Sequence, residues 1–151
     1  MLQHLLAWCQ SRTPGVIALY IPIRGEPDLL AGSERLKERG WQLALPRVVM
    51  RDAPIAFAPW QPGEPLERDH AGVLAPVSEE RLQPDVLLAP CLAYNSQRYR
   101  LGYGAGYYDR TLAEMPETCP IGVAWAGSLV DFRAEPLDVP MQLILTENGL
   151  A

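Results

Sequence analysis

The chain has 151 residues, of which 48% are hydrophobic and 21% are charged, and its formal net charge is -5. A chain of this length fits one compact domain, expected to span residues 1–151, with enough apolar residues to bury a core. The negative charge and the absence of a long Lys/Arg run argue against a nucleic-acid partner and against a membrane-surface partner.

The cysteines and the first residues of the chain bear on its compartment. Cys9, Cys91 and Cys119 are widely separated and form no C-x-x-C pair, which favours reduced thiols. Residues 1–10 are apolar but short and lack a basic flank, so they resemble neither a signal peptide nor a membrane-spanning helix. We therefore expect a cytoplasmic protein, and we further expect a monomer.

The first third of the chain has the pattern of a β-α-β unit. Apolar residues at helical spacing predict a helix over 1–10, which the following Thr-Pro-Gly sequence ends. A continuous apolar run at 16–22 predicts a strand covered on both faces. The more polar segment 29–40 predicts a helix, and 41–46 predicts the next strand. Strands connected in this way pair in parallel.

The rest of the chain returns to regular patterns after a region rich in proline. Five prolines between residues 47 and 83 exclude long elements there and indicate short edge strands joined by loops, with 55–60 as the best candidate. A buried strand is predicted at 85–90 and a helix at 107–115. Two further strand-like runs lie at 120–126 and 142–147. The predicted fold class is α/β, a single-domain, mainly parallel sheet with helices on both faces, Rossmann-like in its three layers.

A glycine-rich stretch, RLGYGAGYYDR at 100–110, is the candidate functional segment. Ligands of open α/β sheets bind at the carboxyl ends of strands, and this stretch follows such an end. Its alternating glycines permit positive φ and close approach of backbone N–H groups, so it can cradle phosphate oxygens. A tight hairpin that needs glycine for its bends is the alternative. Asp109, between Arg100 and Arg110, favours the phosphate interpretation, because an acid can hold the magnesium of a nucleoside triphosphate.

A longer segment, PCLAYNSQRYRLGYGAGYYDR at 90–110, resembles the signature of the 5-formyltetrahydrofolate cyclo-ligase (5,10-methenyltetrahydrofolate synthetase) family. In that family P-G-L-A-F-D leads to G-x-R-L-G-Y-G-G-G-Y-Y-D-R. Further pieces agree in order along residues 16–149: YIPIRGE (20–26), LPRV (45–48), GVLAP (72–76), LDVPM (137–141) and TENG (146–149). The resemblance implies an ATP- and magnesium-dependent reaction on a reduced folate. The formyl oxygen of 5-formyltetrahydrofolate is phosphorylated, and an adjacent folate nitrogen then closes the methenyl ring as phosphate leaves.

The resemblance also implies roles for individual residues. The catalytic residues would be Arg100 and Tyr108. The ATP-binding residues would be Arg100, Leu101, Gly102, Tyr103, Gly104, Ala105, Gly106, Tyr107 and Tyr108. The folate would be held by Ile21, Glu26, Tyr103 and Tyr107, and magnesium by Asp109 and Asp138. Alternatives stay open: Glu26 as a loop acid, Asp138 as a turn cap, and Tyr107 and Tyr108 as packing residues of a helix.

The sequence departs from the family pattern at several polar positions. The family opens with a basic K-x-x-L-R helix that grips the ATP phosphates, and this sequence begins after that point. Asn95, Ala105 and Leu137 stand where the family has an acid, a glycine and a histidine. Whether Arg98 or Arg12 replaces the missing cations is left open. Two functions are therefore predicted: an active cyclo-ligase, or a catalytically impaired relative that serves as a nucleotide- or folate-binding or interaction module.

Overall fold

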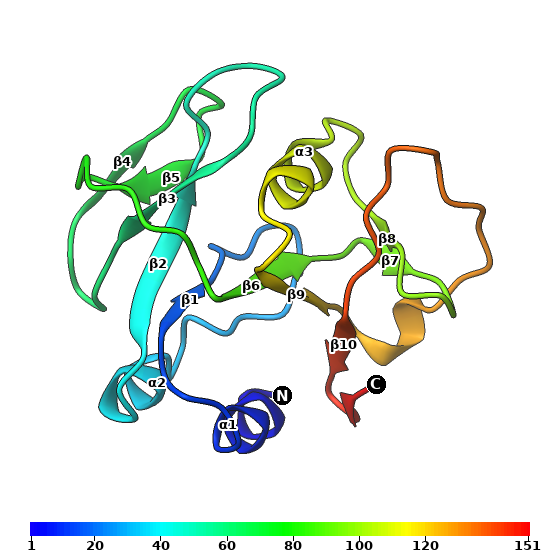
Figure 1. Ribbon diagram of the computed structural model, residues 1–151, viewed down its shortest axis with the longest axis horizontal. Helices are drawn as coiled ribbons and strands as arrows, with labels where there is room; N and C mark the ends of the chain where they lie inside the picture. The colour runs from blue at the N-terminus through cyan, green and yellow to red at the C-terminus, as the bar shows by residue number, and fades with distance from the viewer.

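A seven-stranded sheet forms the centre of the computed structural model, which describes residues 1–151 (Figure 1). Its strands, from one edge to the other, are β11 (Gly149–Leu150), β10 (Leu143–Thr146), β9 (Cys119–Val123), β6 (Val86–Pro90), β1 (Val16–Ala18), β2 (Gln42–Arg47) and β3 (Ala56–Pro59). The five inner strands are parallel to one another, and the two edge strands are antiparallel to their neighbours. Apolar runs without alternation therefore became inner parallel strands, as the sequence predicts.

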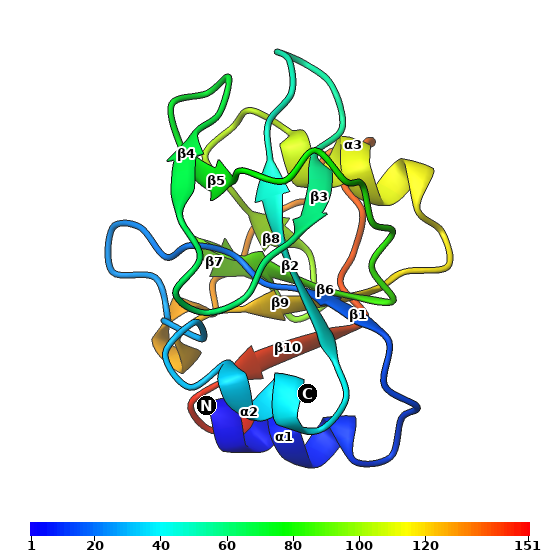
Figure 2. The same cartoon turned by 90° about the vertical axis from the view of Figure 1, so that its left-hand side faces the viewer.

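Helices cover both faces of this sheet (Figures 1 and 2). On one face lie α1 (Leu2–Cys9) and α2 (Glu34–Glu38), whose apolar side chains join a cluster of 18 buried residues. On the other face lies α3 (Tyr107–Glu114), whose Leu112 joins a smaller cluster of nine. The predicted α/β class, with a mainly parallel sheet between helices, is confirmed.

Two short hairpins and a single 3-10 turn complete the structure. The hairpin of β4 (Leu66–Arg68) and β5 (Leu74–Pro76) lies in the proline-rich region, where the sequence predicts short strands and loops. The hairpin of β7 (Ala93–Tyr94) and β8 (Arg100–Leu101) joins β6 to the glycine-rich stretch. The 3-10 turn η1 (Ala126–Ser128) follows β9. No helix has the length and apolar character needed to cross a membrane.

Two predicted elements are shorter in the structure than their sequence patterns. The strand predicted at 16–22 ends at Ala18, and the helix predicted at 29–40 is reduced to α2. The Asp28 carboxylate accepts hydrogen bonds from the amides of Leu30 (2.9 Å) and Ala31 (3.3 Å), and Gly32 has a φ of +83°. This local turn satisfies the backbone that would otherwise begin the helix.

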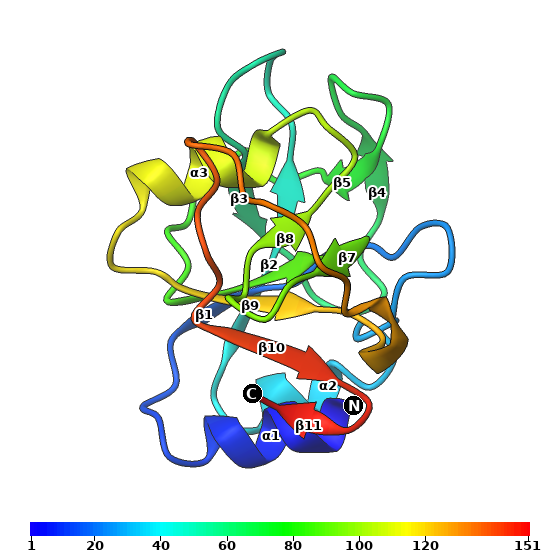
Figure 3. The same cartoon turned by 90° about the vertical axis from the view of Figure 1, so that its right-hand side faces the viewer.

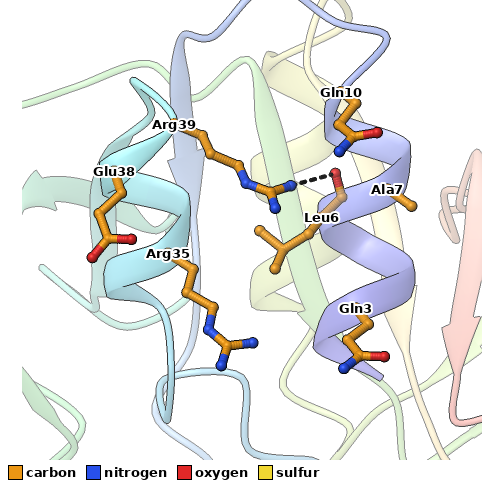
Figure 4. Close-up of a pocket in the computed structure, with 7 residues that line it drawn as sticks. All are labelled: Gln3, Leu6, Ala7, Gln10, Arg35, Glu38 and Arg39. Carbon is orange, nitrogen blue, oxygen red and sulfur yellow. Dashed lines mark hydrogen bonds between the residues drawn. The ribbon is translucent and has the colours of Figure 1, made fainter.

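The two helices on the α1 face lie next to each other across a polar groove of about 460 Å³ (Figure 4). The Arg39 guanidinium reaches across this groove from the end of α2 and donates to the carbonyl of Leu6 at 3.3 Å. Leu6 itself is buried, so the groove is a seam between packed helices. None of the predicted site residues lies in it.

The order of the strands fixes where a ligand can enter. From β1 the chain continues outward to β2 and β3, whereas from β6 it continues in the opposite direction to β9 and β10. β1 and β6 are parallel neighbours, with Ile17 opposite Val86 and Ala18 opposite Leu87. Their carboxyl ends therefore form a topological switch point, which is the place where open α/β sheets bind ligands.

Candidate functional site

A cavity of about 440 Å³ opens at this switch point. Every site residue predicted from the sequence lines it: Ile21, Glu26, each residue from Arg100 to Tyr108, Asp109 and Asp138. They come from three separate parts of the chain, namely the loop after β1, the segment from β8 into α3, and the loop before β10. The structure thus brings together residues that the sequence places more than one hundred positions apart.

The glycine-rich loop, residues 102–106, forms one wall of the cavity and leads directly into α3. Gly104 and Gly106 have φ values of +91° and +71°, which favour glycine, whereas Ala105 is not among the residues with positive φ. None of the five amides donates a backbone hydrogen bond outside the regular elements. A row of unpaired N–H groups in front of a helix N-terminus provides donors and a partial positive charge for an anion.

Arg100 lies beneath this loop and is held in a defined position. Its Nε and Nη2 donate to the carbonyl of Pro90, at 3.2 and 2.9 Å, and its guanidinium lies 4.9 Å from the centroid of the Tyr108 ring. A Cβ on Gly102 would come within 2.8 Å of Nη2, so only glycine leaves room for the guanidinium there. Arg100 is the one basic residue that lines the cavity.

The three tyrosines of the segment have different environments. Tyr108 packs against the Arg100 guanidinium, and burial raises the pKa of its hydroxyl, so the hydroxyl stays protonated. Tyr107 is half-buried and packs against the smaller core cluster, although it also lines the cavity. Tyr103 is 47% exposed, and the Arg24 guanidinium lies 5.2 Å from its ring centroid. Tyr107 thus combines the packing role and the cavity position between which the sequence leaves a choice.

The loop after β1, residues 20–27, carries Ile21 and Glu26 to the opposite wall. The buried Tyr20 hydroxyl donates to the carbonyl of Pro27 at 2.6 Å and closes the loop. The Glu26 carboxylate accepts the amide of Ile23 at 2.9 Å. Burial raises the pKa of Glu26, while that hydrogen bond and the nearby Arg100 and Arg24 act in the opposite direction. Only one oxygen of the carboxylate is engaged by Ile23, so the other can accept N–H donors from a ligand in the cavity.

Asp109 and Asp138 meet where α3 passes the segment that precedes β10, which Figure 3 shows as an orange trace beside the helix. The Asp109 carboxylate accepts the amide of Val139 at 3.1 Å, and that of Asp138 accepts the amide of Glu135 at 2.8 Å. Burial raises the pKa of Asp109; the bond to Val139 and the charge of Arg100 oppose the shift, and the adjacent Asp138 adds to it. Two carboxylates that disfavour each other's charge suit a shared cation.

The carboxylate pair is not part of a larger ligand cluster. No group of three or more His, Cys, Asp or Glu side chains converges on a point that could hold a metal ion. A magnesium ion at Asp109 and Asp138 would therefore take its other ligands from phosphate oxygens and water, which is the usual coordination of magnesium beside a nucleotide. The donor set, two oxygen ligands beside a phosphate-sized cradle, fits that ion.

Several residues of the site lie in the proline-rich region, where the sequence predicts only short strands and loops. Apolar side chains next to β2 and β3 and in the β4–β5 hairpin also line the cavity: Val48, Ile55, Val73 and Leu74. Asp69 also lines the cavity, but its carboxylate is engaged by the amides of Val48, Ala71 and Val73. The similarity of LPRV and GVLAP to family motifs pointed to Val48, Val73 and Leu74, whereas no motif pointed to Ile55.

The structure explains one departure from the family pattern and shows where Arg98 and Arg12 lie. Asn95 is buried; its amide donates to Phe132 O at 3.1 Å, which an acid could not do, and its oxygen accepts the amides of Gln97 and Tyr99. Arg98 donates to Ala151 O, and Arg12 packs over the Trp8 ring. Neither arginine lines the cavity.

Comparison with known proteins gives consistent matches over most of the chain. The model of the 5-formyltetrahydrofolate cyclo-ligase family matches residues 1–147. The 5-formyltetrahydrofolate cyclo-ligase of Mycoplasma pneumoniae is 33% identical over 134 residues, which cover 87% of this chain and 73% of that protein. The enzyme of the same name from Mycolicibacterium smegmatis is 35% identical over 142 residues, which cover 86% and 72%.

Solved structures agree with these matches. A 5,10-methenyltetrahydrofolate synthetase from Mycoplasma pneumoniae superposes with a TM-score of 0.73 at 30% identity, covering 95% of this chain and 80% of the other. The 5,10-methenyltetrahydrofolate synthetase of Aquifex aeolicus gives a TM-score of 0.77 at 27% identity, covering 99% and 79%. The fold described above is therefore shared with these proteins.

Proposed function

The chain belongs to the 5-formyltetrahydrofolate cyclo-ligase family, and we propose that it performs the ATP- and magnesium-dependent cyclisation of 5-formyltetrahydrofolate to 5,10-methenyltetrahydrofolate. The observation that carries the proposal is the single cavity at the β1/β6 switch point. It brings together an amide-lined loop for the ATP phosphates, a carboxylate pair for magnesium and an apolar wall for the folate. We also expect the chain to act as a monomer.

The ATP phosphates would lie in the cradle formed by residues 101–107, with the loop amides as donors. Arg100 would face the same phosphates with Nη1, because Pro90 O already engages Nε and Nη2. Its fixed position means that little conformational entropy is lost when it contacts the charge that moves during phosphoryl transfer. Tyr108 holds Arg100 from the other side through its ring. Arg100 and Tyr108 are therefore the residues we assign to catalysis.

Magnesium would be held by Asp109 and Asp138 and would neutralise the phosphate oxygens during the transfer. The five carboxyl groups that line the cavity, against one arginine, make this ion necessary for ATP to bind. They are Glu26, Asp69, Asp109, Glu135 and Asp138. Without a cation, the negatively charged triphosphate would be repelled by these carboxylates.

The reduced folate would lie between the loop of residues 20–27 and the tyrosines of the glycine-rich segment. Ile21 would support one face of the pterin, and Tyr103 and Tyr107 would supply aromatic walls. The Glu26 carboxylate would accept hydrogen bonds from the pterin amino and ring N–H groups. This arrangement would aim the formyl oxygen at the phosphate cradle, where it would be phosphorylated by ATP. The adjacent folate nitrogen would then attack the activated formyl carbon, and phosphate would leave.

One observation favours the second function, a catalytically impaired relative that binds nucleotide or folate. Among the residues that line the cavity, only Arg100 is basic. Each charge-assisted contact to phosphate that the family pattern has and this cavity lacks would reduce the binding free energy of ATP by about 1.5–3 kcal/mol, which is one or more orders of magnitude in affinity. The chain could then retain a binding site while turning over slowly.

The experiment that separates these functions is a direct assay of turnover. The purified chain is supplied with 5-formyltetrahydrofolate, ATP and magnesium, and formation of the methenyl product is followed by its absorbance. We expect turnover in the parent and a loss of about a hundredfold or more in kcat/KM for Asp109→Asn, because the variant has lost a charged magnesium ligand. Binding of ATP without any turnover would favour the impaired relative, and equal activity in parent and variant would refute the metal assignment.

A further inference from the structure

The arginine that follows Asp109 contacts the outside of the glycine-rich loop. Arg110 does not line the cavity, although Ala105 and Gly106 beside it do. Its Nη1 donates to the carbonyl of Ala105 at 2.6 Å, and its Nη2 lies 3.6 Å from Oδ1 of Asp52. A Cβ built on Gly106 would lie 3.4 Å from the same Nη1, so the guanidinium packs directly against this part of the loop.

Arg110 also fixes the next peptide unit. Its backbone N–H donates to the carbonyl of Gly106 at 3.1 Å, which is the first hydrogen bond of α3. One residue therefore engages two successive carbonyls of the loop, through its side chain and its backbone. The peptide bonds of the chain are all trans, and in a trans unit the N–H points opposite to the C=O. When the carbonyls of Ala105 and Gly106 are held by Arg110, the amides of Gly106 and Tyr107 face the other way.

We propose that Arg110 is a positioning residue of the nucleotide site, which turns the Gly106 amide toward the phosphate groups by holding the carbonyl of Ala105 away from the cavity. The inference rests on the proposed function, because it assigns the loop amides to phosphate. Arg110 itself does not contact the ligand. Asp52 anchors the second amino group of the guanidinium and so keeps the first on the carbonyl.

The alternative to this role is a purely structural one, in which Arg110 only stabilises the loop and the start of α3. The two roles differ in what they affect. A structural role changes thermal stability and the binding of both substrates together. A positioning role weakens phosphate binding selectively, because only the amide donors of the loop lose their alignment.

The test compares the parent chain with Arg110→Gln, Arg110→Lys and the control Arg81→Gln. Arg81 also donates to backbone carbonyls, those of Glu79 and Glu80, and its replacement changes the charge equally, far from the loop. The affinity for inorganic tripolyphosphate with magnesium is measured by calorimetry, and the KM values for ATP and for 5-formyltetrahydrofolate are measured in turnover.

We expect Arg110→Gln to weaken tripolyphosphate binding roughly tenfold and to raise the KM for ATP similarly, with the KM for the folate unchanged. Arg110→Lys, which keeps a charged donor for the carbonyl, should lose only about two- to threefold, and Arg81→Gln should match the parent. If Arg110→Gln does not fold, Asp52→Asn and Arg110→Lys carry the test, because each should still weaken tripolyphosphate binding measurably.

Three results would overturn the inference. The first is parental tripolyphosphate affinity in Arg110→Gln, or in both of the milder variants. The second is an equal rise in both KM values together with a fall in melting temperature. The third is a parent that binds no tripolyphosphate, which would overturn the proposed function as well. A parent that binds tripolyphosphate without turnover, and loses that binding in Arg110→Gln, would support the inference while the proposed function failed.

Discussion

The two faces of the central sheet are built differently. The face under α1 and α2 is filled by 18 buried residues, many of them leucine, isoleucine and valine. The face under α3 holds nine, and three of these are the alanines that point from the inner strands: Ala18, Ala44 and Ala89. The cavity lies on this side of the sheet, beyond the carboxyl ends of β1 and β6, and the first residues of α3 line it.

The face that carries the cavity therefore has the smaller hydrophobic core. Closely packed interiors exclude ligands, because every void of useful size costs free energy of unfolding. The α1 face supplies the stability that the α3 face lacks. The α3 face instead holds a carboxylate, Asp109, whose burial raises its pKa and whose charged form therefore disfavours folding.

The largest expected effect separates the two faces through neighbouring residues of β6. Leu87 and Leu88 are both fully buried, but Leu88 belongs to the cluster under α1 and α2, and Leu87 to the cluster under α3. Leu88→Ala should lower the free energy of unfolding by about 2–5 kcal/mol with kcat/KM unchanged below the transition. Leu87→Ala should cost less stability and lower kcat/KM, because it loosens the support of α3. Chemical denaturation and the turnover assay measure both; identical outcomes for the pair would refute the comparison.

The sequence predicts the inner strands of the sheet more completely than the short strands of the hairpins and of the edge. Continuous apolar runs indicate inner parallel strands, because both sides of each strand are covered, and these runs became β1, β2, β6, β9 and β10. By contrast, β4, β5, β7, β8 and β11 are two or three residues long. Elements of that length have no periodicity, and their pairing depends on distant contacts that local propensity does not contain.

The site was predictable only where it follows a contiguous motif. The signature at 90–110 predicted the glycine-rich loop and Asp109, two short motifs predicted Glu26 and Asp138, and all of these residues line the cavity. The apolar wall was only partly indicated in this way: Val48 lies in LPRV, and Val73 and Leu74 lie in GVLAP, but these motifs do not show that the hairpin folds over the cavity. The outward contact of Arg110 on Ala105 also requires the loop conformation.

A second prediction tests whether the α3 face tolerates added volume. Gly102→Ala would place a Cβ within 2.8 Å of Arg100 Nη2, so the guanidinium must move from its position on Pro90 O. We expect the KM for ATP to rise about tenfold, the effect of losing one charge-assisted contact. Gly127→Ala is the matched control, because nothing lies within 4 Å of its added Cβ and its φ is not positive. Equal KM values in the two variants would show that the position of Arg100 does not matter for ATP.

A third prediction concerns pH and the carboxylate pair. Burial, reinforced by Asp138, raises the pKa of Asp109, so a proton competes with magnesium at higher pH than at an exposed aspartate. Burial also favours the protonated form of Asp109 in the folded chain relative to the unfolded chain. The contribution of Asp109 to the free energy of unfolding is therefore lost as pH rises through its folded pKa. The magnesium concentration for half-maximal activity should rise about fivefold on acidification from neutral to mildly acidic pH. Asp138→Asn should move this dependence to lower pH; a magnesium requirement independent of pH would contradict the assignment.

The smallest expected effect lies where the loop of residues 20–27 meets the glycine-rich loop. The Arg24 guanidinium lies 5.2 Å from the Tyr103 ring centroid, and the Trp125 indole donates to Gly25 O at 2.8 Å. A cation over an exposed ring contributes about 0.5–1 kcal/mol, or two- to fivefold in affinity.

If this contact couples the loops, each substrate should bind better when the other is present, and by the same factor in both directions. Arg24→Gln should reduce that factor by two- to fivefold, whereas Tyr103→Phe, which keeps the ring, should leave it unchanged. Calorimetry of a non-hydrolysable ATP analogue with and without the folate measures the factor directly. An unchanged factor in Arg24→Gln would mean that any coupling between the two substrates is carried by other contacts than the one between Arg24 and Tyr103.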